Sequence, residues 1–124
     1  MAEWTALIVE DEPDGQLVIA GILEFFNVAT DSVSTAEDAL QSLAAHHYQA
    51  AIIDLALPGM DGLELVRTIR QNPATANLPC IAVTAYHMSS VKQQALDSGF
   101  DAYFAKPIDD TIFVRELNRI IARS

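Results

Sequence analysis

Short apolar runs alternate along the chain with longer stretches in which apolar residues recur every three or four positions. The runs predict strands because they are too short for helices, whereas the longer stretches predict helices that each bury one apolar side. The expected strands include residues 7–9, 51–53, 81–83 and 102–105, and a further strand ends with residues 31–33. The expected helices span residues 13–26, 35–46, 62–71, 89–98 and 109–123. Regular alternation of strand and helix is typical of a parallel sheet covered by helices on both faces.

The apolar spacing also predicts which side of each helix packs against the sheet. The residues expected to be buried are Val18, Ile22 and Phe25 in the first helix, Ala36, Leu40, Leu43 and Ala44 in the second, and Phe113, Leu117, Ile120 and Ile121 in the last.

Residues that begin and end helices agree with these boundaries. Pro13 stands near the start of the first helix, where its missing N–H is not needed. Ser34 or Thr35 can cap the second helix and Asp61 the third, while Gly59 relieves the backbone of the turn before it. Gly99 follows the fourth helix and is suited to the left-handed residue that ends many helices.

Polar residues stand where four of the expected strands end. Glu10 and Asp11 follow residues 7–9, Asp54 follows residues 51–53, Thr84 follows residues 81–83, and Lys106 follows residues 102–105. Parallel strands place these ends at one edge of the sheet, where open α/β sheets build their sites. Packed carboxylates repel one another unless a cation lies among them, which favours a hard divalent ion such as Mg²⁺. A carboxylate in such a site can act as a nucleophile.

This set of motifs resembles that of response-regulator receiver domains, the phosphoacceptor modules of two-component signalling. The motifs are the acidic pair Glu10-Asp11, the segment 54–62 that begins with Asp54, Thr84-Ala85, and Lys106-Pro107. The resemblance covers essentially the whole chain and implies a single receiver domain over residues 1–124. It further implies a flavodoxin-like (βα)5 fold, with a five-stranded parallel sheet in the order 2-1-3-4-5 and helices on both faces.

The resemblance assigns the metal ligands and the acceptor. Asp54 is expected to take a phosphoryl group from the phosphohistidine of a sensor histidine kinase or a histidine phosphotransfer protein. Asp11, Asp54 and the backbone carbonyl of Ala56 are expected to bind Mg²⁺, and Glu10 is expected to act through bound water. Glu10 stands where many members of the family have aspartate, so it adds one methylene of reach.

The remaining motifs imply phosphoryl binding and a switch. Lys106 and Thr84 are expected to contact phosphoryl oxygens, and the family holds the Lys106–Pro107 peptide bond in the cis form. Thr84 and Tyr103 are the expected switch pair, which would remodel the surface of the fourth helix, fifth strand and fifth helix. That surface is the expected contact for a downstream effector or a phosphorylation-dependent dimer.

Two positions bear on the lifetime of the phosphoryl group. Ala56 and Tyr86 flank the route by which water reaches the acyl phosphate in this fold, and neither carries a carboxylate or carboxamide that could orient the water. Self-dephosphorylation is therefore expected to be slow.

Composition narrows the class of protein. Seventeen acids against seven Lys and Arg give a formal charge of −10, and without a basic stripe direct nucleic-acid binding is not expected. Cys80 is the only cysteine and is expected to be a buried core residue. The start of the chain lacks the features of a secretion signal, and no apolar stretch is long enough to span a membrane, so a cytoplasmic protein is expected. His46, His47 and His87 are expected to be surface residues.

Three other functions are alternatives. A phosphatase of the haloacid dehalogenase type would need a second aspartate where Ala56 stands. A flavodoxin would need a phosphate-binding loop after the first strand, but residues 10–12 are all acidic. A pseudo-receiver that works only through protein contacts would not need Asp54, Thr84 and Lys106. A stand-alone regulator, a phosphorelay intermediate and part of a larger regulator or hybrid kinase all remain open, as do the cognate kinase, the output target and the oligomeric state.

Overall fold

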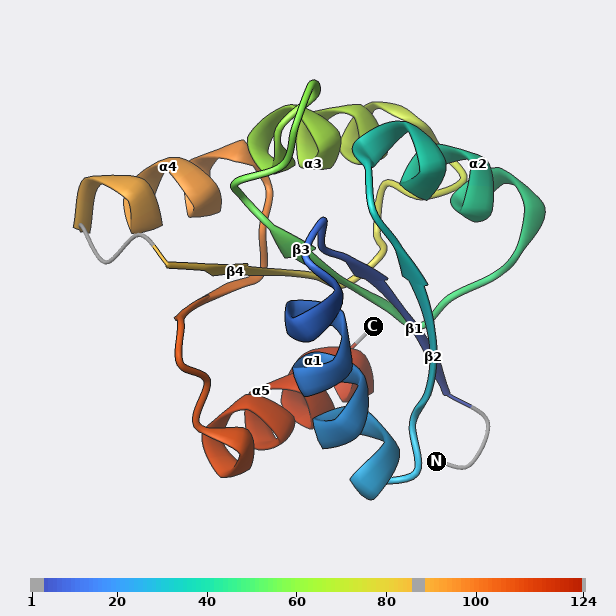
Figure 1. Ribbon diagram of the computed structural model, residues 1–124. Coiled ribbons are helices and arrows are strands. Elements are labelled where there is room, and N and C mark those ends of the chain that lie inside the picture. The colour runs from blue at the N-terminus through green and yellow to red at the C-terminus, as the bar shows by residue number, and fades with distance from the viewer. Residues whose placement is uncertain (1–3, 86–88, 124) are drawn as a thin grey trace.

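Five strands and five helices alternate in the computed structural model, which describes residues 4–85 and 89–123 (Figure 1). The strands are β1 (Thr5–Val9), β2 (Ala29–Val33), β3 (Ala50–Asp54), β4 (Cys80–Thr84) and β5 (Ala102–Ala105). The helices are α1 (Pro13–Phe25), α2 (Ala36–Ala45), α3 (Gly62–Gln71), α4 (Ser89–Ser98) and α5 (Asp110–Arg123). The predicted elements are confirmed, with helix ends within one residue of those expected.

All neighbouring strands are parallel, and the sheet order is β2-β1-β3-β4-β5, as expected. Helices α1 and α5 cover one face, and α2, α3 and α4 cover the other (Figure 1). Each face of the sheet has its own hydrophobic core beneath the helices. Alternate residues along each strand pack into one core or the other, since successive side chains point to opposite faces. Leu7 and Val9 of β1, for example, pack on the α2–α3 side, whereas Ile8 packs on the α1–α5 side.

The α1 face predicted from apolar spacing is wrong. Val18 and Phe25 are 58% and 81% exposed and Ile22 is half-buried, whereas Ile19 and Leu23 are buried against the sheet. Helix α1 carries apolar residues around most of its circumference, so more than one stripe has helical spacing. The connection from β1 to the helix sets its rotation, and spacing alone contains no information on that connection.

The other two faces were predicted better. In α5, Phe113, Leu117 and Ile120 are buried and Ile121 is half-buried, as expected. In α2, Ala36 is buried and Leu40 and Leu43 pack at the edge of the core. The prediction failed only for Ala44, which is exposed, while Ala39 takes the buried place. Alanine is apolar but small, so its presence says little about which side of a helix is buried.

Capping residues act as the sequence indicates. Pro13 is the first residue of α1, Thr35 Oγ1 accepts a hydrogen bond from Asp38 N at 3.0 Å, and Asp61 Oδ1 accepts one from Glu64 N at 2.9 Å. Of the two candidate caps for α2, Thr35 is therefore the one used. Gly59 and Gly99 have φ angles of 72° and 124°, which favour glycine at both positions.

Cys80 is buried at the start of β4, as expected. Burial raises the pKa of its thiol to about 12. Among the described residues, no helix is both long and apolar enough to cross a membrane.

Candidate functional site

Three carboxylates meet at the carboxyl edge of the sheet. Residues Val9 of β1 and Ile53 of β3 are register partners, so the acids that follow them become neighbours. One carboxylate oxygen from each of Glu10, Asp11 and Asp54 lies within 4.8 Å of the others. Glu10 is fully buried and Asp54 is 5% exposed, whereas Asp11 is exposed. The convergence predicted from the strand ends is therefore present.

Lys106 bridges two of these acids from the end of β5. Its Nζ lies 2.6 Å from Glu10 Oε1 and 2.8 Å from Asp54 Oδ2. The backbone N–H of Lys106 donates to the carbonyl of Thr84 at 2.8 Å, which ties the lysine to the end of β4. The Lys106–Pro107 peptide bond is cis, as the resemblance implied. An ammonium thus lies against the carboxylate expected to be the acceptor.

The two oxygens of Asp54 have different partners. Oδ2 pairs with Lys106, and Oδ1 accepts a hydrogen bond from the backbone N–H of Ala56 at 2.9 Å. Ala56 itself is exposed. These two contacts hold the Asp54 carboxylate in one orientation at the end of β3, which is the positioning that a nucleophile requires.

Glu10 is held from several sides. Its backbone N–H donates to Val33 O at 3.0 Å, its carbonyl accepts from Gln16 Nε2 at 2.7 Å, and its Oε2 accepts from Glu12 N at 3.3 Å. Burial, with the nearby Asp54 charge adding to it, raises the pKa of Glu10 above its usual range despite the opposing bond from Lys106. Burial alone would lower the pKa of Lys106, but its bonds to Asp54 and Glu10 outweigh burial and raise it.

Thr84 and Tyr103 lie on the same face of the sheet. Tyr103 is the register partner of Ala82, which packs in the core on the α2–α3 side, and Thr84 follows Ala82 by two residues on the same strand. Thr84 is fully buried. Tyr103 is half-buried against that core, and burial raises the pKa of its hydroxyl. The two side chains assigned to the switch therefore face the same layer of helices.

The chain matches the family model of the response regulator receiver domain over residues 6–118. It is a response regulator receiver domain. An uncharacterised 14.6 kDa protein from Leptolyngbya boryana is 35% identical over 115 residues, covering 93% of this chain and 88% of that protein. Response regulator ArlR of Staphylococcus aureus is 35% identical over 117 residues, covering 94% of this chain and 52% of ArlR. The receiver domain thus spans about half the length of ArlR.

Solved structures agree in fold. A response regulator from Chloroflexus aurantiacus superimposes with a TM-score of 0.93 at 31% identity, covering 96% of this receiver domain and 98% of that chain. The receiver domain of sensor histidine kinase PA1611 from Pseudomonas aeruginosa superimposes with a TM-score of 0.88 at 31% identity, with the same two coverages. In that structure a magnesium ion is coordinated in the active site cleft.

The acidic cluster of this receiver domain suits a hard divalent cation. Its donors are carboxylate oxygens, which Mg²⁺ prefers. Three carboxylates against the ammonium of Lys106 also leave a formal charge of −2, which a divalent ion would balance. Glu10, Asp11 and Asp54 are the residues that could hold it. The assignment of the Ala56 carbonyl as a further ligand stays a prediction.

Some of the residues that shape the site were not anticipated. Gln16 bridges the carbonyls of Glu10 and Val33, and Gly15 lies against the side chain of Glu10. A glutamine and a glycine in a first helical turn give no signal in sequence that distinguishes them from ordinary surface residues. Tyr86 and His87 lie outside the described residues, so the expected role of Tyr86 stays a prediction.

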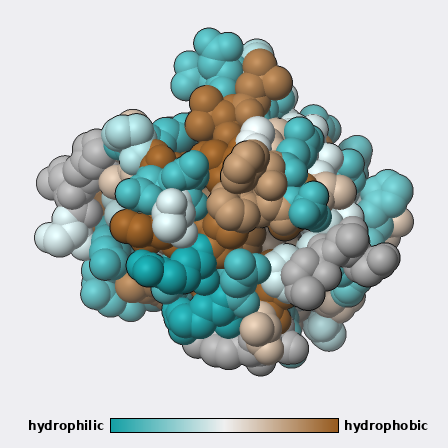
Figure 2. All heavy atoms as spheres, turned by 90° about the horizontal axis from the view of Figure 1, so that it is seen from below, coloured by the Kyte–Doolittle hydropathy of each residue, from teal (hydrophilic) through white to brown (hydrophobic). Residues whose placement is uncertain are grey.

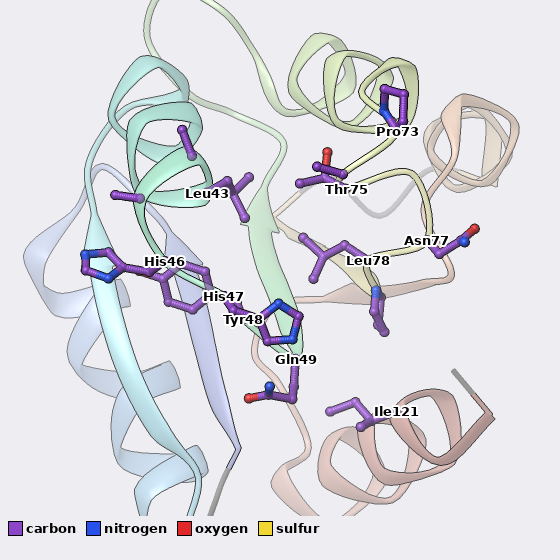
Figure 3. Close-up of a pocket in the computed structure, with 14 residues that line it drawn as sticks. Leu43, His46, His47, Tyr48, Gln49, Pro73, Thr75, Asn77, Leu78 and Ile121 are labelled. Atoms are coloured by element: carbon purple, nitrogen blue, oxygen red, sulfur yellow. The ribbon is translucent and has the colours of Figure 1, made fainter.

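One hollow in the surface lies away from this chemistry. A cavity of about 970 Å³ opens between the connections that lead into β3 and β4 (Figure 3). His46, His47, Tyr48 and Leu78 line it, and Ile121 of α5 closes its far side. These connections enter the amino ends of the strands, opposite the acidic cluster. Both histidines are exposed, as expected, and lie on the other edge of the sheet from the acids.

Proposed function

We propose that this receiver domain accepts a phosphoryl group on Asp54 from the phosphohistidine of a sensor histidine kinase or a histidine phosphotransfer protein. The observation that carries the proposal is the contact of Lys106 Nζ with Asp54 Oδ2, 2.8 Å apart beside the acidic cluster. The aspartate is buried and oriented, a cation lies beside it, and donors for the phosphoryl oxygens end the adjacent strands. Phosphoryl transfer depends mainly on such positioning and charge compensation.

The transfer itself is a displacement at phosphorus. A carboxylate oxygen of Asp54 forms the new O–P bond while the N–P bond of the phosphohistidine breaks, and the electron pair of that bond stays on the imidazole nitrogen. Mg²⁺ bound by Asp11, Asp54 and the Ala56 carbonyl would supply positive charge against the phosphoryl oxygens. Lys106 would exchange a carboxylate partner for a phosphoryl oxygen, and the Thr84 hydroxyl would donate to another.

Phosphorylation would change the surface formed by α4, β5 and α5. Movement of the Thr84 hydroxyl toward the phosphoryl group would free space on the face that it shares with Tyr103, and Tyr103 would turn inward to fill it. Phosphorylation would then shift the population between two arrangements of α4, β5 and α5. A downstream effector protein or domain, or a second phosphorylated copy, would bind that altered surface. The domain would act as a switch rather than as an enzyme with a separate substrate.

The exposed side of α1 offers a docking face for the phosphoryl donor. Figure 2 views the molecule from the side of α1 and α5, and apolar atoms gather near its centre. Leu17, Val18 and Phe25 of α1 are among the exposed large apolar residues. Helix α1 begins just after the acidic pair, so a protein that covers its outer side lies next to the edge where Asp54 is reached. Burial of these side chains would favour that association.

Slow loss of the phosphoryl group also belongs to the proposal. The residue two after the acceptor is Ala56, whose exposed methyl group has no atom that could orient an attacking water. The phosphorylated domain should therefore persist for minutes or longer after the donor is removed. Loss within seconds would show that another group activates water.

The test is intact-mass spectrometry after incubation with Mg²⁺ and acetyl phosphate or phosphoramidate. A single phosphoryl adduct should form, require Mg²⁺, and be absent from Asp54→Ala. Asp97→Ala is the matched control because Asp97 is an exposed aspartate on α4. An adduct that persists in Asp54→Ala would assign another acceptor, and no adduct with either donor would favour a pseudo-receiver that works through contacts alone.

A further inference from the structure

The side chain of Glu10 lies directly against Gly15, in the first turn of α1. A Cβ atom added at Gly15 would lie 2.7 Å from both Cδ and Oε1 of Glu10 and 2.9 Å from its Cγ. Real Cβ atoms essentially never come closer than 3.0 Å to another heavy atom. Any side chain at position 15 would therefore have to displace the carboxylate of Glu10.

The backbone does not require glycine at this position. Gly59 and Gly99 are the glycines with positive φ among the described residues, and Gly15 is an ordinary helical residue within α1. Glycine destabilises a helix by up to about 1 kcal/mol relative to alanine. The contact with Glu10 is the physical reason that the structure offers for its presence.

Glu10 cannot move aside without losing contacts of the site. Its carboxylate is fully buried, and Oε1, one of the two atoms nearest to the added Cβ, is the atom that pairs with Lys106 at 2.6 Å. Its other oxygen accepts from Glu12 N. A methyl group at position 15 would thus press on one of the two carboxylate oxygens that pair with Lys106.

We propose that Gly15 is a positioning residue for the site: the space left by its missing side chain admits the longer acid Glu10 and lets its carboxylate lie against Lys106 within the acidic cluster. Gly15 and Glu10 then form a matched pair, because aspartate at position 10 is one methylene shorter and would leave room for a side chain. An effect of Gly15 on phosphoryl transfer rests on the function proposed above, whereas its effects on the position of Glu10 and on Mg²⁺ binding do not.

The test compares Gly15→Ala with Gly21→Ala. Both glycines lie in α1, but a Cβ at Gly21 would meet nothing within 4 Å. Isothermal titration calorimetry should give a Mg²⁺ dissociation constant raised about tenfold in Gly15→Ala, as for loss of a group that orients metal ligands. Gly21→Ala should bind Mg²⁺ as the parent does. Circular dichroism melts would check that both variants fold.

The double variant distinguishes a displaced Glu10 carboxylate from a general loss of stability or Mg²⁺ binding. In the Glu10→Asp background, adding Gly15→Ala should change Mg²⁺ affinity by less than about twofold, because the shorter acid no longer occupies that space. An equal loss in both backgrounds would overturn the proposal, and so would parental affinity in Gly15→Ala. A crystal structure of Gly15→Ala supplies a readout that needs no metal. It should show Glu10 Oε1 moved away from Lys106 Nζ, and an unchanged pair would refute the proposal even if no variant were phosphorylated.

Discussion

Replacing one leucine of α1 at a time tests which side of the helix faces the sheet. Leu23 is fully buried, whereas Leu17 of the same helix is 71% exposed. The substitutions Leu23→Ala and Leu17→Ala remove the same atoms and have nearly the same effect on helix propensity. Any difference in stability between the two variants therefore reports burial alone.

The expected magnitudes follow from that burial. Leu23 packs in the core between α1, α5 and the sheet, and truncating a fully buried leucine to alanine costs about 2.7 to 5.0 kcal/mol in transfer and cavity terms. Leu17→Ala changes an exposed position and should alter the free energy of unfolding by no more than about 0.5 kcal/mol. The two variants should thus differ by at least ~2 kcal/mol.

Urea unfolding followed by circular dichroism and by the fluorescence of Trp4 provides the assay. Trp4 is the only tryptophan and packs against the same core. With a slope of about 1.5 kcal/mol per molar urea, the expected difference moves the midpoint by more than ~1 M. Equal losses in the two variants, or a larger loss in Leu17→Ala, would refute the rotation of α1 that buries Leu23 and exposes Leu17.

Three further predictions concern charges and the thiol. Lys106→Met should tighten Mg²⁺ binding about tenfold in calorimetric titration, because it removes a positive charge from the acidic cluster. Weaker binding would show that the lysine helps to hold the ion. Arg70 donates to the carbonyls of Ala76, Leu78 and Gly99 and pairs with Asp101, so Arg70→Ala should cost about 2 to 4 kcal/mol in urea unfolding. Arg70→Lys should not restore that loss, because lysine lacks the planar fork, and full restoration would mean that charge alone suffices. Cys80 should react with iodoacetamide at pH 8 only when the protein unfolds, since burial raises the pKa of its thiol to about 12. Labelling at the rate of a free thiol, measured by intact-mass spectrometry, would contradict its burial.

The strand ends could be predicted because each site residue directly follows a run of buried residues. Buried parallel strands appear in sequence as short apolar runs, and the residue after such a run lies at the carboxyl edge of the sheet. This reasoning placed Glu10, Asp54 and Lys106 together, and the ion pairs of Lys106 bear it out. The caps at Thr35 and Asp61 were predictable for a similar reason, since a capping hydrogen bond spans only three residues.

The sequence by itself thus determined the order of elements, the strand ends and the acids that meet there, because these depend on patterns that are local in the chain. The tertiary structure alone decided the rotation of α1, which buries Ile19 and Leu23 and exposes Val18 and Phe25. It also decided the contact of Gly15 with Glu10 and the pairing of Lys106 with two acids. The rotation of α1 depends on the path of the chain from β1 into the helix. The contacts of Glu10 and Lys106 depend on distances between atoms in the folded chain, and the spacing of residue types along the chain does not encode such distances.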